Sequence, residues 1–309
     1  MPNPEFLSLD HRVVPFDQAR VHVLAPAFKY GATVFEGLRG YWNPGQKQMF
    51  LFRVQEHLQR LQAGMRMLRF ADAAGNRRLL DSLIELIEAN RFRETVHIRM
   101  LAYVDGDGEI GATGPVGIAI AAHARPLSPQ GRTGIKLGVS SWRRMNDASM
   151  PPRLKTTANY VNSRLAALEA RQNGFDNALI LNSGGKVSEA PTACFFMVRH
   201  GRLVTPSITS DILESVTRAT IVELARDRLG LQVEERDIDR TELYDCEEAF
   251  ICGTGPEIVP VTHVDRLPIG DGVPGSQTRR IQELYFAVVA GEVAAYGHWL
   301  TPALSRVDA

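Results

Sequence analysis

Hydrophobic and polar positions alternate over several short segments in the first third of the chain. Within 96–102 every second residue is apolar, and His97 and Arg99 lie between them, which is the period of a strand with one buried face. Other segments carry apolar residues at helical spacing. The patterns predict strands over 21–23, 33–41, 49–52, 96–103 and 117–122, and helices over 58–68 and 79–87. Because His97 and Arg99 share a strand face, we interpret that face as the wall of a polar cavity.

The rest of the chain predicts a run of hairpins between longer helices. Its pattern predicts strands over 135–141, 177–181, 186–189, 194–199, 203–205, 232–236 and 248–252, and helices over 159–172, 216–229 and 277–295. The segment 124–134 is rich in Pro, Gly and Ser, which is typical of a linker. We therefore predict an α/β protein, in an α+β arrangement of two domains: a small domain over 1–123, a linker over 124–134 and a large domain over 135–309.

Length and charge narrow the functional classes. A chain of 309 residues with 44% hydrophobic residues can bury a large core, and its 35 basic residues balance its 35 acidic ones. This balance argues against nucleic acid and anionic membranes as partners. Neither a signal peptide nor a membrane-spanning run is visible, so we expect a cytoplasmic protein. Five of the 35 cations are lysine, at Lys29, Lys47, Lys136, Lys155 and Lys186.

Two patterns that often mark binding sites do not support one here. Three cysteines without CxxC spacing, and histidines without paired spacing, favour neither a disulfide framework nor a metal site. Gly106, Gly108 and Gly111 spell GxGxxG after a predicted strand. The residues that follow cannot open a helix, so we reject a dinucleotide site there. Lys155 precedes a predicted helix, and a lysine at such a position is ordinarily a solvated surface charge.

Seven motifs change the interpretation of Lys155. They are YGATVFEGLRGY (30–41), HLQRL (57–61), IRMLAY (98–103), KTTANY (155–160), VSEA (187–190), LVTPSITSDILESVTR (203–218) and FICGTGPEIVPV (250–261). In this order and spacing the chain resembles the fold type IV pyridoxal phosphate enzymes, most closely the branched-chain amino acid aminotransferases. The resemblance implies the two-domain fold of that group, with pyridoxal 5'-phosphate at the domain interface.

The resemblance also implies a role for individual residues. Lys155 would form the Schiff base with the cofactor, and Glu189 would contact its pyridine nitrogen. The other implied cofactor contacts are Arg60 and Thr254 with the phosphate, the 215–217 segment (Ser215, Val216, Thr217) with the phosphate, Tyr160 with the phenolic oxygen and Leu213 with the ring. The implied substrate contacts are Tyr30, Phe35, Gly37, Arg39, His97, Arg99 and Gly255.

General chemistry is consistent with two of these roles. A carboxylate beside the pyridine nitrogen keeps that nitrogen protonated, so the ring can accept the electrons released at the substrate Cα. Glu189 fits this role better than a neutral residue. The 215–217 segment precedes a predicted helix, and backbone N–H groups at a helix N-terminus suit a phosphate. Without the resemblance, an ordinary helix cap would explain that segment equally well.

The implied reaction is the transfer of an amino group from a branched-chain or other aliphatic L-amino acid to 2-oxoglutarate, with ping-pong kinetics. The implied assembly is a homodimer or a larger assembly of dimers. Two positions depart from the family pattern: His97 replaces a usual tyrosine, and Cys194, near Pro191, replaces a usual asparagine. These departures leave open a D-amino acid transaminase, an (R)-selective amine transaminase and an aminodeoxychorismate lyase. A catalytically silent small-molecule-binding protein on the same fold is a further alternative.

Overall fold

The computed structural model of the protein describes residues 3–71, 75–126 and 128–304. Its contacts divide the chain into two compact units. Unit 1 consists of Met1–Pro126, Lys155–Ala158 and Ala287–Ala309, and unit 2 of Leu127–Leu154 and Asn159–Phe286. The sequence analysis placed the whole of 135–309 in the large domain. In the structure, Lys155–Ala158 belongs to unit 1 because it pairs with a unit 1 strand, and the C-terminal segment does so because it adds a strand to the unit 1 sheet.

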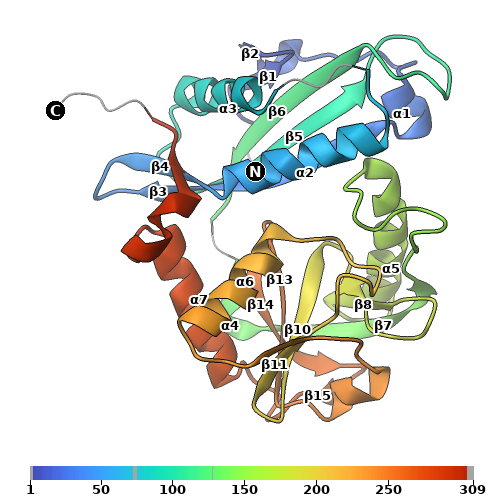
Figure 1. The fold of residues 1–309 in the computed structure, drawn as a ribbon, viewed down its shortest axis with the longest axis vertical. Coiled ribbons are helices and arrows are strands. Elements are labelled where there is room, and N and C mark those ends of the chain that lie inside the picture. The colour runs from blue at the N-terminus through green and yellow to red at the C-terminus, as the bar shows by residue number, and fades with distance from the viewer. Residues whose placement is uncertain (1–2, 72–74, 127, 305–309) are drawn as a thin grey trace. The chain divides into compact units, whose positions relative to one another are not determined.

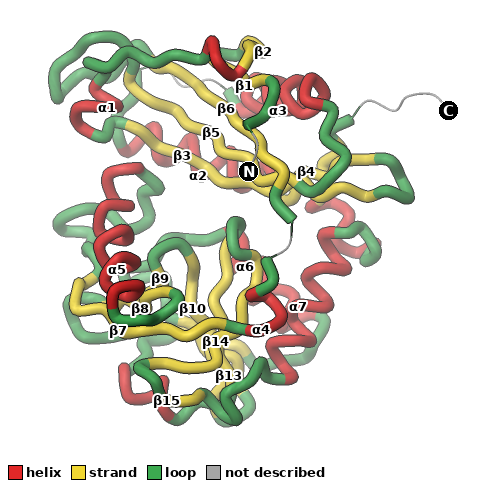
Figure 2. Tube along the Cα trace, turned by 180° about the vertical axis from the view of Figure 1, so that it is seen from behind, coloured by secondary structure: helices red, strands yellow, loops and turns green. Residues whose placement is uncertain are grey.

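Unit 1 is built on a seven-stranded sheet in which every neighbouring pair is antiparallel (Figure 2). In sheet order its strands are β16 (Leu300–Pro302), β4 (Gln48–Phe52), β3 (Thr33–Asn43), β5 (Val96–Val104), β6 (Val116–Ala124), β1 (Phe6–Leu9) and β2 (Arg12–Pro15). Its helices are α1 (Pro26–Tyr30), α2 (Val54–Met67) and α3 (Asn76–Asn90), with 3₁₀ turns at Phe16–Gln18 and Ala294–Trp299.

Two amphipathic helices cover one face of this sheet. Along α2 the apolar residues Val54, Leu58, Leu61 and Met65 recur every three or four positions, and all four are buried. Helix α2 packs on β3, while α3 packs on α2, β1 and β6 (Figure 1). The residues of β3 and β5 that face these helices are therefore the even-numbered ones. The odd-numbered residues of the same strands form the opposite face.

Unit 2 is built on a mixed nine-stranded sheet. Its main path is β12 (Val233–Glu235), β11 (Arg202–Thr205), β10 (Ala193–Arg199), β13 (Glu248–Gly253), β14 (Glu257–Val264), β7 (Ile135–Arg143) and β8 (Asn177–Leu181), with β9 (Glu189–Ala190) on β10 and β15 (Leu267–Pro268) on β14. Its helices are α4 (Gln130–Thr133), α5 (Tyr160–Gln172) and α6 (Val216–Asp227), with 3₁₀ turns at Thr157–Asn159 and Arg240–Tyr244, and α7 (Ser276–Val289) runs from unit 2 into unit 1. Phe195, Met197, Ile251 and Val261 lie in its core.

The structure corrects several predicted elements. The segment 21–23 is not a strand, and Val21 and Val23 are 59% and 65% exposed. The predicted strand 186–189 shortens to β9, and the predicted helix 277–295 ends at Val289. Strands β1 and β2 and helix α1 were not predicted, because short elements carry too few residues to establish a period. Strand β14 was not predicted either.

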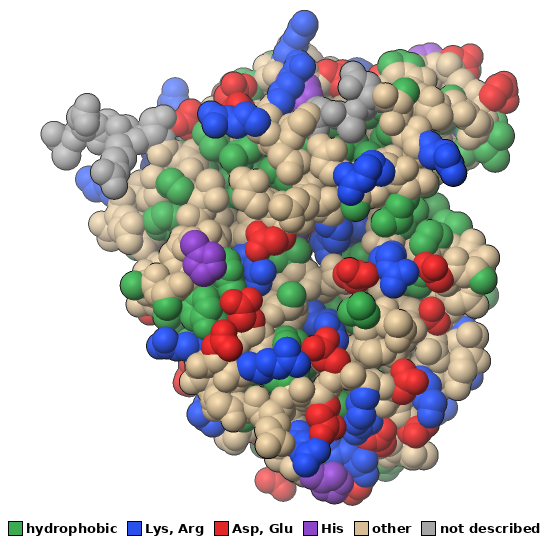
Figure 3. All heavy atoms as spheres, in the orientation of Figure 1, with side chains coloured by type: hydrophobic (Ala, Val, Ile, Leu, Met, Phe, Trp, Pro, Cys, Tyr) green, Lys and Arg blue, Asp and Glu red, His purple; other side chains and the backbone are tan. Residues whose placement is uncertain are grey.

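Charged side chains of both signs lie on the surface of unit 2. Over unit 2, the face in Figure 3 shows Lys and Arg side chains intermingled with Asp and Glu. Among the residues that the structure describes, no helix is long and apolar enough to cross a membrane. All three cysteines are buried thiols.

Candidate functional site

Lys155 is held against strand β3 by backbone pairing. The Phe35 N–H donates to the Lys155 carbonyl at 2.9 Å, and the adjacent Thr156 forms an antiparallel bridge with Val34. The Thr156 hydroxyl also donates to the Thr33 carbonyl at 2.7 Å. These bonds orient the half-buried Lys155, and its Nζ lies 4.8 Å from the centre of the Phe35 ring. Lys155 is therefore part of a strand-like segment that pairing holds in place.

A buried carboxylate on the helix-facing side of β3 binds an arginine and a histidine of α2. Glu36 accepts hydrogen bonds from Arg60 Nε at 2.6 Å, from Arg60 Nη2 at 2.8 Å and from His57 Nδ1 at 2.7 Å. The Glu36 and His57 side chains are 1% and 3% exposed. We call Glu36, His57 and Arg60 the Glu36 cluster. Sequence reasoning missed Glu36 and His57, although an acid between Val34 and Leu38 on a predicted buried face was a usable signal.

Burial and the pairing of Glu36 with its partners act in opposite directions on the pKa values of Glu36 and His57. Burial alone would raise the pKa of Glu36, but Arg60 and His57 more than offset it and lower that pKa to about 2. Burial lowers the pKa of His57, even though Glu36 acts in the opposite direction. The charge of Lys155 also acts to lower the pKa of His57.

The opposite face of the β3–β5 pair carries the predicted substrate residues. Gly37 pairs with Arg99 and Arg39 pairs with His97, so all four side-chain positions share one face. A Cβ at Gly37 would come within 3.2 Å of His97 Nε2, so the His97 ring lies over the glycine. The Arg99 guanidinium lies 5.0 Å from the centre of the Phe35 ring. This face of the β3–β5 pair therefore carries two arginines beside His97, and we call it the cationic wall.

Two further residues extend this wall. Arg39 donates from Nη1 to the Arg125 carbonyl at 2.6 Å, and His123 pairs with His97 across the β5–β6 register. Burial lowers the pKa of His97 to about 3, and the charges of Arg125, Arg99, Arg39 and His123 act in the same direction. His97 is therefore neutral at physiological pH. Sequence reasoning placed Arg125 in a linker, and no pattern in that segment signals its position.

Unit 2 gathers a second set of predicted residues around Glu189. Glu189 Oε1 lies 2.5 Å from Arg144 Nη2, and the two side chains are 6% and 5% exposed. The Leu213 N–H donates to Glu189 Oε2 at 3.2 Å, and the Cys194 thiol lies 4.0 Å from the same oxygen. Cys194, one of the departures noted in the sequence, thus lies against the predicted ring-nitrogen partner. Arg144 was not predicted, because nothing in its sequence context separates it from Arg143.

The start of helix α6 has the geometry of an anion site. Ser215 is the N-cap, and its hydroxyl accepts from the Arg218 N–H at 3.2 Å. Val216 and Thr217 begin the helix and are both buried, so their backbone N–H groups lie at its positive end. Leu213 precedes this cap by two residues. The 215–217 segment is therefore joined to Glu189 through the backbone of Leu213.

The remaining predicted residues lie at element ends. Thr254 and Gly255 form the turn between β13 and β14. Tyr160 is the first residue of α5 and is half-buried. Tyr30 is the last residue of α1 and is 43% exposed. The structure thus places Lys155, Arg60 and the β3–β5 wall in unit 1, with Arg60 on the α2 side of the sheet and the wall on the opposite side. It places Glu189, Leu213 and the 215–217 segment in unit 2.

A comparison with known families identifies the chain. The model of the class IV aminotransferases matches residues 33–264. The chain belongs to the class IV aminotransferase family. Residues 33–264 contain Lys155, Glu189 and both strands of the cationic wall.

Individual relatives cover nearly the whole of this aminotransferase. A probable branched-chain-amino-acid aminotransferase of Aquifex aeolicus is 36% identical over 306 residues, which are 98% of each chain. The branched-chain aminotransferase of Thermobaculum terrenum in its PLP form superposes with a TM-score of 0.93 at 41% identity, over 99% of this chain and 100% of that one. The branched-chain aminotransferase of the archaeon Thermoproteus uzoniensis with norvaline has a TM-score of 0.92 at 36% identity, over 97% and 100%.

Proposed function

We propose that this aminotransferase uses pyridoxal 5'-phosphate to move the amino group of branched-chain and other aliphatic L-amino acids to 2-oxoglutarate. The observation that carries the proposal is Lys155, which backbone pairing holds beside the Phe35 ring. The names of the relatives from A. aeolicus, T. terrenum and T. uzoniensis support the substrate class, and the PLP form of the T. terrenum enzyme supports the cofactor.

The residues present fit this cofactor by their chemistry. A lysine, a buried carboxylate and a helix N-terminus are the groups that an aldehyde, a pyridine nitrogen and a phosphate require. The remaining proposed cofactor contacts are Arg60 and Thr254 with the phosphate, Tyr160 with the phenolic oxygen and Leu213 with the ring face. When bound, pyridoxal phosphate supplies an aldehyde that condenses with amines and a ring that accepts an electron pair.

The chain's own residues then have separate tasks. Lys155 would hold the cofactor covalently, and its free amine would take the proton from the substrate Cα. Glu189 holds a proton at the pyridine nitrogen. The N–H groups of Val216 and Thr217 hold the phosphate.

The cationic wall of unit 1 suits carboxylate substrates. Arg39, Arg99 and neutral His97 line one sheet face together with Phe35 and Gly37, so the face combines anion-binding groups with an apolar ring. An amino acid substrate and 2-oxoglutarate both carry carboxylates, and L-leucine also carries an apolar side chain. We include Tyr30 and Gly255 among the substrate contacts.

A donor panel tests the substrate class. Purified protein loaded with pyridoxal phosphate is mixed with 2-oxoglutarate and L-leucine, D-alanine or (R)-1-phenylethylamine, and glutamate formation is measured. We expect rapid turnover with L-leucine. Turnover with D-alanine or the amine and none with L-leucine would instead identify a transaminase of that other class. Pyruvate released from aminodeoxychorismate, with no transamination, would identify a lyase.

A lysine substitution tests the chemistry. Lys155→Ala should lower kcat by at least about 10²–10⁴-fold and abolish the borohydride-stable mass increase on the peptide that contains residue 155. Lys136→Ala is the matched control, because Lys136 is exposed on β7 and should leave both readouts intact. A wild type that binds the cofactor but transfers no amino group from any donor would support the silent binding protein.

We further propose a homodimer, or an assembly of such dimers. Large apolar side chains are exposed around α1 and the 105–112 loop: Val23 at 65%, Phe28 at 71% and Ile110 at 77%. The two segments adjoin, because Lys29 Nζ lies 3.4 Å from Asp107 Oδ1. An apolar patch of this kind is typical of an interface between subunits.

Light scattering coupled to size exclusion tests the assembly. We expect twice the chain mass of 34.2 kDa, or a multiple of that value, for the wild type and a smaller species for Phe28→Asp. A wild type that elutes at the mass of one chain would contradict the homodimer.

A cytoplasmic location stays a prediction from the sequence.

A further inference from the structure

Arg144 binds three separate parts of unit 2 with one guanidinium. Its Nη2 pairs with Glu189 Oε1 at 2.5 Å, its Nη1 donates to the Ser163 hydroxyl of α5 at 3.2 Å, and its Nε donates to the Asp211 carbonyl at 3.3 Å. Its backbone N–H donates to the Leu181 carbonyl at the end of β8. Arg144 is 6% exposed, so neither its charge nor its orientation is set by solvent.

Both carboxylate oxygens of Glu189 have partners inside unit 2. Oε1 faces Arg144, whereas Oε2 accepts from the Leu213 N–H and lies 4.0 Å from the Cys194 thiol. These contacts fix the direction in which the carboxylate points. The guanidinium also compensates the negative charge, which would be costly to bury without a partner.

The Asp211 contact extends the effect of Arg144 toward helix α6. Asp211 has a φ of +60°, a conformation that residues other than glycine rarely adopt. Its carbonyl accepts from both Arg144 and the Ser188 hydroxyl, which lies next to Glu189. The chain then continues through Leu213 to the Ser215 cap. One arginine therefore supports the Glu189 carboxylate and the loop that leads to the 215–217 segment.

We propose that Arg144 is a positioning residue for the reaction: it orients the Glu189 carboxylate toward the pyridine nitrogen, and it acts through Glu189. The inference rests on the proposed function, because it presumes that Glu189 meets that nitrogen. Stability alone is a poor explanation of the pair. A buried ion pair gains little over apolar side chains of the same volume, since both charges lose their hydration.

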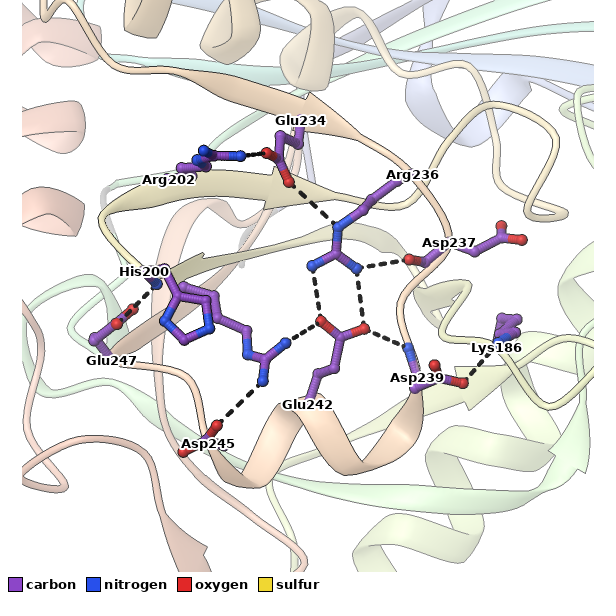
Figure 4. Close-up of polar contacts among 11 residues, drawn as sticks. Lys186, His200, Arg202, Glu234, Arg236, Asp237, Asp239, Glu242, Asp245 and Glu247 are labelled. Carbon is purple, nitrogen blue, oxygen red and sulfur yellow. Dashed lines mark hydrogen bonds and ion pairs between the residues drawn. The ribbon is translucent and has the colours of Figure 1, made fainter.

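A second arginine–glutamate pair in unit 2 supplies the matched control. Arg236 binds Glu242 through two parallel hydrogen bonds of 3.0 and 2.7 Å (Figure 4). Glu242 also accepts from Arg199 at 2.7 Å, and we call Glu242, Arg199 and Arg236 the Glu242 cluster. None of these three residues is among the proposed cofactor or substrate contacts. Arg236→Gln therefore removes an arginine–glutamate pair of unit 2, a more exposed one, without touching the proposed machinery.

The experiment is a double-mutant cycle on cofactor binding. The dissociation constant of pyridoxal phosphate is measured by fluorescence titration for the wild type, Arg144→Gln, Glu189→Gln and the double variant, and kcat and KM are measured alongside. Arg144→Gln should weaken binding and lower kcat by about 10–100-fold, as loss of supporting groups does in other sites, with little change in KM for L-leucine. In the Glu189→Gln background the same change should cost less than about threefold.

The alternatives give different results. Equal costs of Arg144→Gln in both backgrounds, as expected for Arg236→Gln, would show that Arg144 acts independently of Glu189 and would overturn the inference. Arg144→Lys keeps the charge but not the three-way contact. It should fall between the wild type and Arg144→Gln, and it serves in the same cycle if Arg144→Gln does not fold. A wild type that neither binds the cofactor nor transaminates would overturn the proposed function as well, whereas additive costs in an active enzyme overturn this inference alone.

Discussion

The Glu36 cluster of unit 1 and the Glu242 cluster of unit 2 place a glutamate between two basic side chains with similar bond lengths. Glu36 binds Arg60 and His57 at 2.6–2.8 Å, and Glu242 binds Arg236 and Arg199 at 2.7–3.0 Å. In both clusters the carboxylate pKa is about 2. The clusters differ in burial, because the Glu36 side chain is 1% exposed and the Glu242 side chain 13%.

The balance of forces behind the two pKa values also differs. At Glu36 the largest effect is burial, which raises the pKa, and only the attraction of Arg60 and His57 reverses it. At Glu242 the largest effect is the hydrogen bond from Arg236, and burial is secondary. The two carboxylates therefore have equal pKa values for different reasons. Glu36 depends on its protein partners because it is buried, whereas solvent can partly replace the partners of Glu242.

The largest expected difference between the two clusters is in the free energy of unfolding after each loses an arginine. In cofactor-free protein, Arg60→Met should lower the free energy of unfolding by about 3–5 kcal/mol, because it leaves the Glu36 charge buried. Arg236→Met should lower it by about 0–1 kcal/mol, because Glu242 keeps Arg199 and solvent. Urea unfolding followed by circular dichroism measures both. Equal losses would contradict the contrast drawn between the clusters.

Acid titration is the second test. The pKa of Glu36 falls from 4.5 to about 2 on folding, so its stabilisation is complete above pH 4.5 and disappears as the pH drops toward 2. By this shift the wild type should lose about 3 kcal/mol relative to Glu36→Gln over that interval. Glu242→Gln should change the acid limb less, because solvent screens its partners. A larger effect at Glu242 in acid urea unfolding would reverse the comparison.

Salt should change the contributions of the two clusters to the free energy of unfolding by different, smaller amounts. At about 1 M NaCl the screening length is roughly 3 Å, so the contribution of the more exposed Glu242 cluster should decrease. The contribution of the Glu36 cluster should hold, because ions do not reach a carboxylate that is 1% exposed. Unfolding of Glu36→Gln and Glu242→Gln at low and high salt measures both contributions. The contrast fails if the Glu36 contribution is the one that salt weakens.

The smallest effect is expected at the edge of the Glu242 cluster. Arg202 pairs with Glu234, which also contacts Arg236, and the Arg202 side chain is 53% exposed. Arg202→Gln should change the free energy of unfolding by no more than about 0.5 kcal/mol, because exposed pairs contribute little. A loss comparable with that of Arg60→Met would mean that the surface network acts as one unit.

Most long elements could be predicted from the sequence, because each carries its own period. The patterns predicted β3, β5, β6, α2, α3 and α6 close to their observed bounds. The prediction failed for β1, β2 and β14. Strand β14 reads EIVPVTHV, in which all residues but His263 are buried, so neither alternation nor a clean helical period distinguishes it. A segment of this kind becomes a strand because β13 and β7 flank it.

The sequence by itself determined the family of this aminotransferase. The order of its motifs selected Lys155 and Glu189 as candidate site residues, and the period of 96–102 placed His97 and Arg99 on one face. Only the tertiary structure decided the partners of these residues. It brought Arg60 and His57 to Glu36, Arg125 to the wall near His97, and Arg144 to Glu189, which lies 45 positions away along the chain. Local pattern follows from backbone geometry that each segment carries, whereas an ion pair depends on where distant segments come to pack.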